Sequence, residues 1–255
     1  MNRLFPTTLL ALAWLATGGA SPPNQEIDKG SFVVYSRGQV VGAESFSIEA
    51  RGDSLNVSSR AYQTFRTDQG EESIDKRMVL LAHRSDFGLR MYQSNQRFRG
   101  EELVRGIVIG DTAFTIYREV NGAGEGDRRV LPPGRLFVLD AQLFSLFDLI
   151  CLSLRERTFE TWPISLVTLG ERDSVLEATA THLGHETIRW SAKPVKARKL
   201  RISDGGTTFL VWADPAGRML RLVHEPSELR VERDSQPVKR APPRGAPESG
   251  SKPAG

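Results

Sequence analysis

The amino-acid sequence predicts a mainly β protein with an antiparallel sheet and one apolar helix. Two observations favour this fold class. Turn residues separate alternating apolar and polar runs at roughly 8–15 residues, as in a meandering antiparallel sheet. One segment, residues 140–154, instead has apolar residues at helical spacing. Together they indicate about a dozen strands and one well-defined helix.

The clearest strand signal is the hairpin "FLVWADPAGRMLRLVHEP", residues 209–226. Its flanks alternate with period two, and Asp214, Pro215 and Gly217 occupy the positions that a type I turn and its left-handed closing residue favour. Pro226 has no amide for a ladder, so we expect the return strand to end there.

Further strands are expected on both sides of the helical segment. "NGAGEGD", residues 121–127, is glycine-rich and polar, so it predicts a loop. "HLGHE", residues 182–186, predicts a turn between two strands. The expected strands lie at 31–36, 39–50, 55–66, 75–84, 89–98, 102–110, 113–120, 161–170, 174–183, 185–192, 195–204 and 228–234.

The helical segment "DAQLFSLFDLICLSL" is apolar on more than one side, with Asp140 as the expected N-cap. Such a helix is buried on two faces or covers something apolar. It is too short for a membrane span, which needs about 20 residues. Its apolar residues are Leu143, Phe144, Leu146, Phe147, Leu149, Ile150, Leu152 and Leu154.

Both ends of the chain are expected to lie outside the fold. Residues 1–20 resemble a secretory signal, with Arg3, a short apolar stretch and a small-residue cleavage site. An uncleaved N-terminal anchor is the alternative. Residues 235–255 are rich in Pro, Gly and Ser and predict a disordered basic tail. The sequence therefore predicts a single domain over 21–234, in a periplasmic or secreted protein without a transmembrane span after signal cleavage.

Charge and cysteine content narrow the function classes. The formal net charge is +3, but the two ends carry the excess, so residues 21–234 are close to neutral. A nucleic-acid-binding domain shows basic clustering within its fold, so no nucleic acid is expected as a partner. Cys151 is the only cysteine, which excludes an internal disulfide. Its apolar neighbours predict a buried, inert thiol.

Catalytic and cofactor motifs are missing from the sequence. It has no Gly-x-Ser-x-Gly elbow, P-loop or dinucleotide-binding glycine motif, and we expect neither an enzyme nor a cofactor. An active site assembled from dispersed residues is the alternative. His182 and His185 would suit a metal on a helix, but three-residue spacing in a strand places them on opposite faces, so no metal is expected. "RGDS" at 51–54 reads as a hairpin tip, and "NVS" at 56–58 is a lone glycosylation pattern.

Three segments in this order resemble exported bacterial proteins of a domain-of-unknown-function type, related to the half-barrel of periplasmic lipoprotein carriers. They are residues 33–57, with Val41-Gly42-Ala43-Glu44, residues 135–150, with a Leu-Asp pair before a Phe-rich helix, and residues 211–234. The resemblance covers roughly residues 30–234. It implies an antiparallel, strongly curled sheet, an incomplete β-barrel, with the apolar helix on its concave face. The chain lacks a lipid-accepting cysteine after the signal, which argues against a membrane tether.

A curled sheet with one lining helix forms a concave apolar groove, which is a default binding site. We therefore expect a carrier of an apolar or lipid-like ligand. The alternative is a non-catalytic structural or assembly protein of the cell envelope, whose concave face is filled core and whose partners are envelope proteins. Ligand-binding residues are expected on the helix and among the tryptophans of the second half: Phe144, Phe147, Ile150, Trp190 and Trp212.

Overall fold

In the computed structural model, which describes residues 24–68 and 70–235, fifteen strands form one sheet. The first eight follow one another as antiparallel neighbours: β1 (Gln25–Ser36), β2 (Gln39–Arg51), β3 (Ser54–Thr67), β4 (Gly70–His83), β5 (Leu89–Phe98), β6 (Glu101–Ile109), β7 (Ala113–Val120) and β8 (Ala123–Val130). The other seven are β9 (Leu136–Asp140), β10 (Thr161–Leu169), β11 (Ser174–Trp190), β12 (Lys193–Ser203), β13 (Thr208–Ala213), β14 (Met219–His224) and β15 (Leu229–Arg233).

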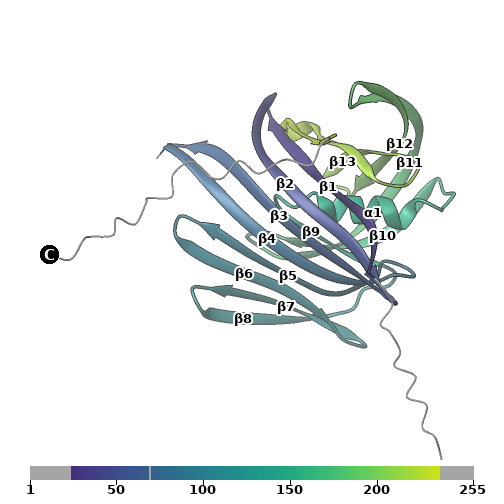
Figure 1. The fold of residues 1–255 in the computed structure, drawn as a ribbon. Helices are drawn as coiled ribbons and strands as arrows, with labels where there is room; N and C mark the ends of the chain where they lie inside the picture. Colours follow the sequence, from purple (N-terminus) through teal and green to yellow (C-terminus); the bar gives the residue numbers. More distant parts are fainter. Residues whose placement is uncertain (1–23, 69, 236–255) are drawn as a thin grey trace, which may run out of the picture.

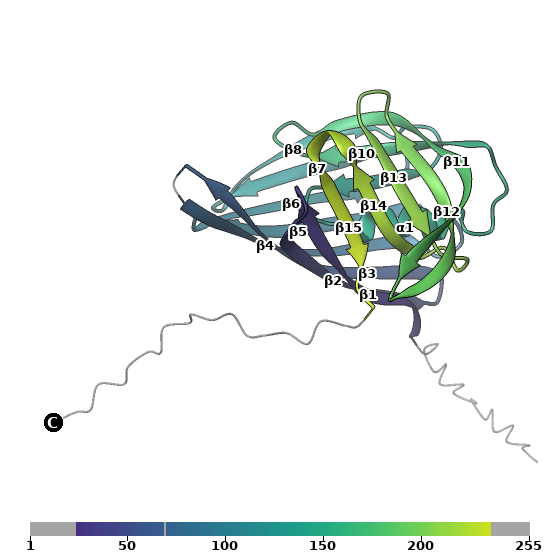
Figure 2. The same cartoon turned by 90° about the horizontal axis from the view of Figure 1, so that it is seen from above.

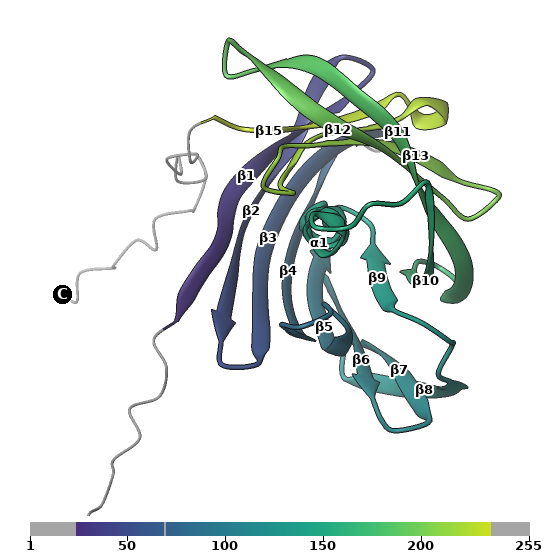
Figure 3. The ribbon, with the colours of Figure 1, turned by 90° about the vertical axis from the view of Figure 1, so that its right-hand side faces the viewer.

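The last strand, β15, pairs with the first, β1, so the two series form one continuous sheet with β8 at one edge and β9 at the other. Only β9 and β10 run parallel, because the helix α1 (Ser145–Leu154) lies between them in the chain. The sheet curls around α1, which Figure 3 shows nearly end-on inside the curve. Figures 1 and 2 show the same curl from two further sides. The sheet does not close into a barrel, which confirms the expected fold class.

Three arginine side chains, rather than backbone hydrogen bonds between strands, connect the two ends of the sheet. Arg105 on β6, Arg118 on β7 and Arg129 on β8 donate hydrogen bonds to the carbonyl oxygens of Gly170, Glu171 and Asp173, at 2.7, 3.4 and 3.1 Å. The acceptors lie in the turn between β10 and β11. Side-chain bonds therefore hold the β8 side of the sheet against the β9 side, and the backbone edges stay unpaired.

The core lies between the curled sheet and α1. All ten helix residues are buried, including Ile150 at 0% exposure. The inner faces of β2, β3 and β4 carry buried residues at every second position, as a half-buried strand requires, and these are apolar except for Glu44, Ser59 and Lys76. Cys151 is buried in this core, and burial raises the pKa of its thiol, which agrees with the inert cysteine expected from its neighbours.

The hairpin expected at 209–226 is confirmed as β13 and β14. Its turn closes with the Gly217 amide donating to the Asp214 carbonyl at 2.9 Å, and Gly217 adopts a φ of +85°. A Cβ on Gly217 would lie 2.6 Å from Cβ of Arg155, so this turn packs tightly against the end of α1. The return strand ends at His224, before Pro226, as expected.

Two expected irregular segments are strands in the structure. Residues 123–130 form β8, an exposed edge strand, although a loop was expected over 121–127. Backbone hydrogen bonds to β7 hold this strand, so its polar side chains do not need to pack in the core. Residues 174–190 form one strand, β11, rather than two. A bulge at Leu183 and Gly184 replaces the expected turn, with Gly184 at a φ of +98°.

The expected signal segment, 1–20, and nearly all of the expected tail, 236–255, lie outside the described residues, so both stay predictions. Within residues 24–68 and 70–235, no helix has the length and apolar character needed to cross a membrane.

Candidate functional site

The start of α1 is held by a carboxylate from a distant strand. Asp140 is not the N-cap expected from the sequence, because it is the last residue of β9 and its side chain points to the sheet. Glu44 on β2 takes the capping role. Its carboxylate accepts hydrogen bonds from the Phe144 amide at 2.5 Å and from the Ser145 amide and hydroxyl at 3.1 and 2.6 Å. The positive end of the helix dipole favours this arrangement, although burial raises the pKa of Glu44.

Asp140 anchors the segment before the helix. Lys76 on β4 forms an ion pair with its carboxylate, and Tyr92 and Ser94 on β5 donate hydrogen bonds to it at 2.5 and 3.0 Å. Arg105 lies 3.6 Å away. Burial lowers the pKa of Lys76, while Asp140 opposes that shift. Burial and the charge of Asp140 raise the pKa of Tyr92 well above its usual range, so its hydroxyl stays a donor.

The middle of α1 is fixed by a second buried cluster. Arg233 on β15 forms a bidentate pair with Asp28 on β1, at 2.5 and 2.9 Å, and lies 3.7 Å from Asp148 of the helix. Asp148 accepts a hydrogen bond from the Met219 amide. Burial and the neighbouring charge of Asp28 raise the pKa of Asp148 well above its usual range.

The C-terminal end of α1 is held by Arg198 on β12, which donates to the carbonyl oxygens of Leu154 and Arg157 at 2.8 and 2.9 Å. Arginine at this end complements the helix dipole. Buried polar contacts therefore fix the start, middle and end of α1 on the concave face.

A cleft of about 530 Å³ lies beside the first half of α1. Its apolar lining comes from the helix approach, the helix itself and strands on the β9 side of the sheet: Leu139, Leu143, Phe144, Phe147, Leu166, Leu169, Leu176, Ile202, Phe209 and Leu229. The polar residues of the lining are Gln63, Asp140, Gln142, Thr168, Ser203, Asp204, Thr207 and His224. The volume and the mainly apolar lining are those of small-molecule sites.

An aromatic row leads from the helix along one wall of this cleft. The ring of Phe147 lies 4.8 Å from that of Phe209, and the ring of Phe209 lies 4.9 Å from that of His224. Nδ1 of His224 and the Ser227 hydroxyl form a hydrogen bond at 2.6 Å. The row combines apolar faces with one polar end, which suits a ligand of mixed character.

The structure separates the five residues expected to bind a ligand. Phe144 and Phe147 line the cleft. Ile150 has 0% exposure and lies outside its lining. Trp212 packs in a separate cluster with Ile188 and Leu220, while the Trp190 indole donates to the Arg233 carbonyl at 2.9 Å.

The expectation that Trp190 and Trp212 bind a ligand together with the helix phenylalanines is therefore wrong for this cleft, because neither tryptophan lines it. The physical reason is strand alternation. Val211 and Ala213 take the helix side of β13, which places Trp212 on the opposite side. Period two reveals that Trp212 and Val211 point apart, and does not reveal which of them faces the helix.

Sequence reasoning missed the cleft residues on the strands, among them Leu166, Leu176, Ile202 and Phe209. Their only signal is alternation within β10, β11, β12 and β13, which marks them as one face of a sheet. That they meet the helix follows from the curl of the sheet.

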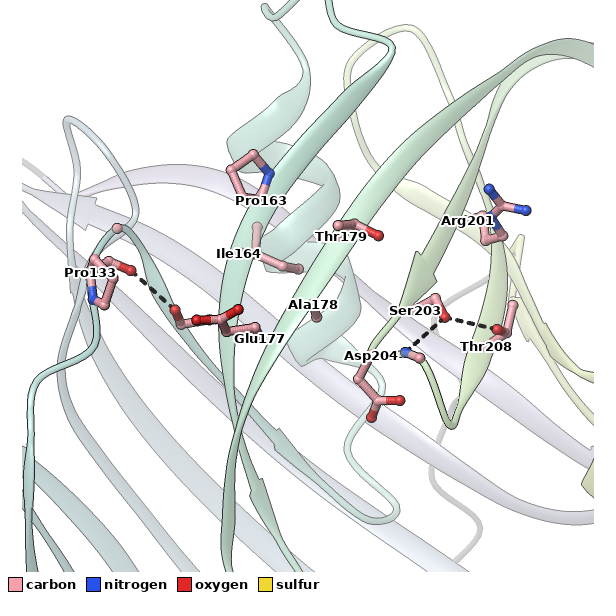
Figure 4. A pocket seen from close by; sticks show the side chains of 13 residues that line it. Pro133, Pro163, Ile164, Glu177, Ala178, Thr179, Arg201, Ser203, Asp204 and Thr208 are labelled. Atoms are coloured by element: carbon pink, nitrogen blue, oxygen red, sulfur yellow. Dashed lines mark hydrogen bonds between the residues drawn. The ribbon is translucent and has the colours of Figure 1, made fainter.

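A second cleft, of about 770 Å³, uses the other face of the same strands (Figure 4). Its lining includes Pro163, Glu177, Thr179 and Arg201, and it shares Ser203 and Asp204 with the first cleft. The Ser203 hydroxyl bonds that of Thr208 at 3.0 Å. This lining includes the charged residues Glu177 and Arg201 and no aromatic ring, whereas three phenylalanines line the first cleft, so the first cleft is the stronger candidate for an apolar ligand.

His182 and His185 lie on the same face of β11, contrary to the expectation from their spacing. The bulge at Leu183 and Gly184 adds one extra residue to β11, so both side chains point to the same side of the sheet, and the two ring centroids lie 5.3 Å apart. No group of three or more His, Cys, Asp or Glu side chains within the described ranges is arranged to hold a metal ion.

The comparisons identify a related fold. No protein-family model matches the chain, and no curated protein matches it. The structure is similar to a crystal structure described as a β-barrel-like protein of the domain of unknown function DUF1849 from Brucella abortus. The TM-score is 0.54 at 8% sequence identity, with 81% of this chain and 95% of that chain covered. A likeness at this identity shows the fold alone. It agrees with the expected barrel-like domain of unknown function, and the expected relation to lipoprotein carriers stays a prediction.

Proposed function

We propose that this chain is an exported, periplasmic or secreted protein that binds an apolar or lipid-like ligand in the cleft beside the first half of α1. The observation that carries the proposal is the open apolar space between the helix and β10–β13, about 530 Å³, in a fold whose helix is already anchored. An unfilled apolar cleft offers a ligand about 0.8 kcal/mol for each methylene it buries.

The anchoring of α1 favours the carrier hypothesis over the hypothesis of a structural protein with a filled core. A core that needs α1 only as packing is served by apolar contacts alone. This chain instead buries carboxylates, which are costly to desolvate, at the start of the helix (Glu44), before it (Asp140) and within it (Asp148). Fixed walls keep the cleft open when it is empty, which lowers the ordering cost of binding.

A neutral fluorescent probe, N-phenyl-1-naphthylamine, tests the proposal without engaging any charged group. We expect saturable binding to the wild-type protein with enhanced, blue-shifted emission. The variant Leu176→Trp fills the cleft from β11 and should reduce the affinity at least tenfold, since it removes the space that the probe occupies.

The matched control is Leu183→Trp, because Leu183 lies on the same strand, is 43% exposed and does not line the cleft. We expect this variant to bind the probe like the wild type. Equal binding by both variants, or no saturable binding by the wild type, would contradict the proposal and favour the structural or assembly role in the envelope.

A further inference from the structure

A third cleft, which is basic, lies at the opposite end of α1 from the apolar cleft. It has a volume of about 490 Å³ and is bounded by the last turn of the helix, the chain that follows it, β11, β12 and the β13–β14 turn. Figure 3 shows the helix with β11, β12 and β13 on the same side of it. Six basic or histidine side chains line it: Arg155, Arg157, His182, His185, Lys196 and Arg198.

Carboxylates neutralise few of the cations that line this cleft. Asp214 is the acidic residue of the lining, and its two carboxylate oxygens accept hydrogen bonds from the amide and guanidinium of Arg218, at 2.9 and 2.8 Å. Arg155 pairs with the exposed Glu156 at 3.1 Å. Within residues 24–68 and 70–235, no carboxylate forms an ion pair with Arg157, Lys196 or Arg198.

The structural role of Arg198 explains only part of this excess. Its guanidinium satisfies the carbonyl oxygens at the end of α1 and stacks on Phe159, 4.6 Å from the ring centroid. Arg157 likewise stacks on Trp162 at 4.4 Å. These rings orient the two guanidinium groups, and among the described residues Arg157 and Lys196 have no carboxylate partner.

The two histidines add an unsatisfied polar atom. The bulge in β11 brings both rings to the cleft, and Nε2 of His182 is buried with no hydrogen-bond partner among the described residues. Buried nitrogen atoms of this kind are rare and call for a partner, such as a ligand. Burial, Arg198 and His185 lower the pKa of His182, so the empty cleft disfavours a further positive charge there.

We propose that this cleft binds a phosphate group, held by Arg157 and Lys196 with His182 and His185 as further hydrogen-bonding partners. Guanidinium and ammonium groups form charge-assisted hydrogen bonds with phosphate oxygens, and an arginine oriented by stacking loses little freedom when it does so. The inference does not depend on the apolar cleft, because the two clefts share no lining residue.

The phosphate can belong to a free small molecule or to a lipid headgroup, which have the same chemistry. Leu200 lines the basic cleft and Ile202 the apolar one, on the same face of β12 and about 7 Å apart. The experiment therefore has two arms. One titrates inorganic phosphate against chloride at constant ionic strength, and the other measures flotation with phosphatidylcholine vesicles with or without phosphatidic acid.

The first readout is the nuclear magnetic resonance of the His182 and His185 ring protons in the chain without residues 1–20. We expect saturable shifts with phosphate and not with chloride, or vesicle binding that requires phosphatidic acid. Shifts without vesicle binding identify a free phosphate as the source, and vesicle binding without shifts identifies a headgroup. Neither response in the wild type would overturn the proposal.

Matched variants separate the cleft from general charge. Lys196→Gln and Arg157→Gln should each weaken binding about tenfold, the loss expected for one charge-assisted hydrogen bond. Lys193→Gln, an exposed lysine at the start of the same strand, should change the affinity less than twofold. Equal effects of Lys196→Gln and Lys193→Gln would overturn the assignment. Binding of the neutral probe should be unchanged in every variant, so the two proposals fail independently.

Discussion

The carboxylate of Glu44 on β2 accepts a hydrogen bond from the amide of Phe144, 2.5 Å away and 100 residues further along the chain. This contact ties the first turn of the helix to the opposite wall of the curled sheet. It also positions Phe144, which lines the cleft, although Glu44 itself does not line it.

Replacing Glu44 should therefore destabilise the fold. In Glu44→Gln the carbonyl oxygen still accepts from the helix amides, but an NH2 group replaces the oxygen that accepts from the Ser145 and Ser59 hydroxyls, and the negative charge beside the helix start is removed. We expect a loss of about 2–3 kcal/mol in the free energy of unfolding, measured by urea denaturation. Glu49→Gln, on the outer face of the same strand, should cost less than about 0.5 kcal/mol. Similar losses in the two variants would contradict the role assigned to Glu44.

The buried pair of Lys76 and Asp140 should behave as a coupled unit. Lys76→Met leaves the Asp140 carboxylate without its ammonium partner, and we expect a loss of about 3–5 kcal/mol. The double variant Lys76→Met/Asp140→Leu should recover part of this loss, because the carboxylate left without its ammonium is also removed, and only the ion pair of Arg105 with Asp140 is lost in addition. A double-mutant cycle measures the coupling, expected above about 1 kcal/mol. Additive losses would show that the two residues do not stabilise the fold as a pair.

Asp148 should make stability depend on pH. Burial raises its pKa in the folded protein above the value of about 3.9 in an unfolded chain. The folded state therefore holds a proton that the unfolded state releases, and the resulting stabilisation is complete below pH 4 and is lost as the pH rises toward the folded pKa.

Asp148→Asn tests this relation, since asparagine keeps an acceptor for the Met219 amide and carries no charge. We expect the variant to resemble the wild type near pH 4 and to become relatively more stable as the pH rises to 8. Urea denaturation across this range gives the comparison. If the wild type instead became more stable than the variant as the pH rises, the difference in the free energy of unfolding would have the opposite sign and the prediction would be wrong.

Phe147 and Ile150 should separate binding from packing. Phe147→Ala opens a wall that already borders a cleft, so we expect a loss of about 2 kcal/mol, below the ~3–5 kcal/mol of an enclosed ring. The same change should weaken binding of N-phenyl-1-naphthylamine. Ile150→Ala should cost about 3 kcal/mol and leave the affinity of the folded protein unchanged. The reverse assignment of the two effects would place the ligand elsewhere.

Features of the fold that depend on neighbouring residues in the sequence were predicted correctly, whereas features that depend on contacts between distant residues were not. Period-two alternation and turn residues predicted the hairpin of Val211 and Leu222 correctly, because those signals are local. The cap of the helix was predicted wrongly at Asp140, since spacing along the chain cannot show that Glu44 lies across the sheet. Gly184 signals a bulge as well as a turn, and only pairing with β12 distinguishes the two.

The candidate site was predictable in part for the same reason. Phe144 and Phe147 were expected from the helix sequence and line the cleft. Phe209 was missed, because its contact with Phe147 depends on how far the sheet curls. The basic cleft was also missed. Arg157, His182 and Lys196 are far apart in the sequence, and the near-neutral charge of residues 21–234 conceals their concentration at one end of α1.

The most direct test of the central claim is native mass spectrometry of the protein purified from its own cells, followed by organic extraction. The account predicts a bound apolar or lipid-like molecule in the wild type that is absent from Leu176→Trp and retained in Leu183→Trp. A ligand-free mass for the wild type, together with no saturable binding of the neutral probe, would contradict it.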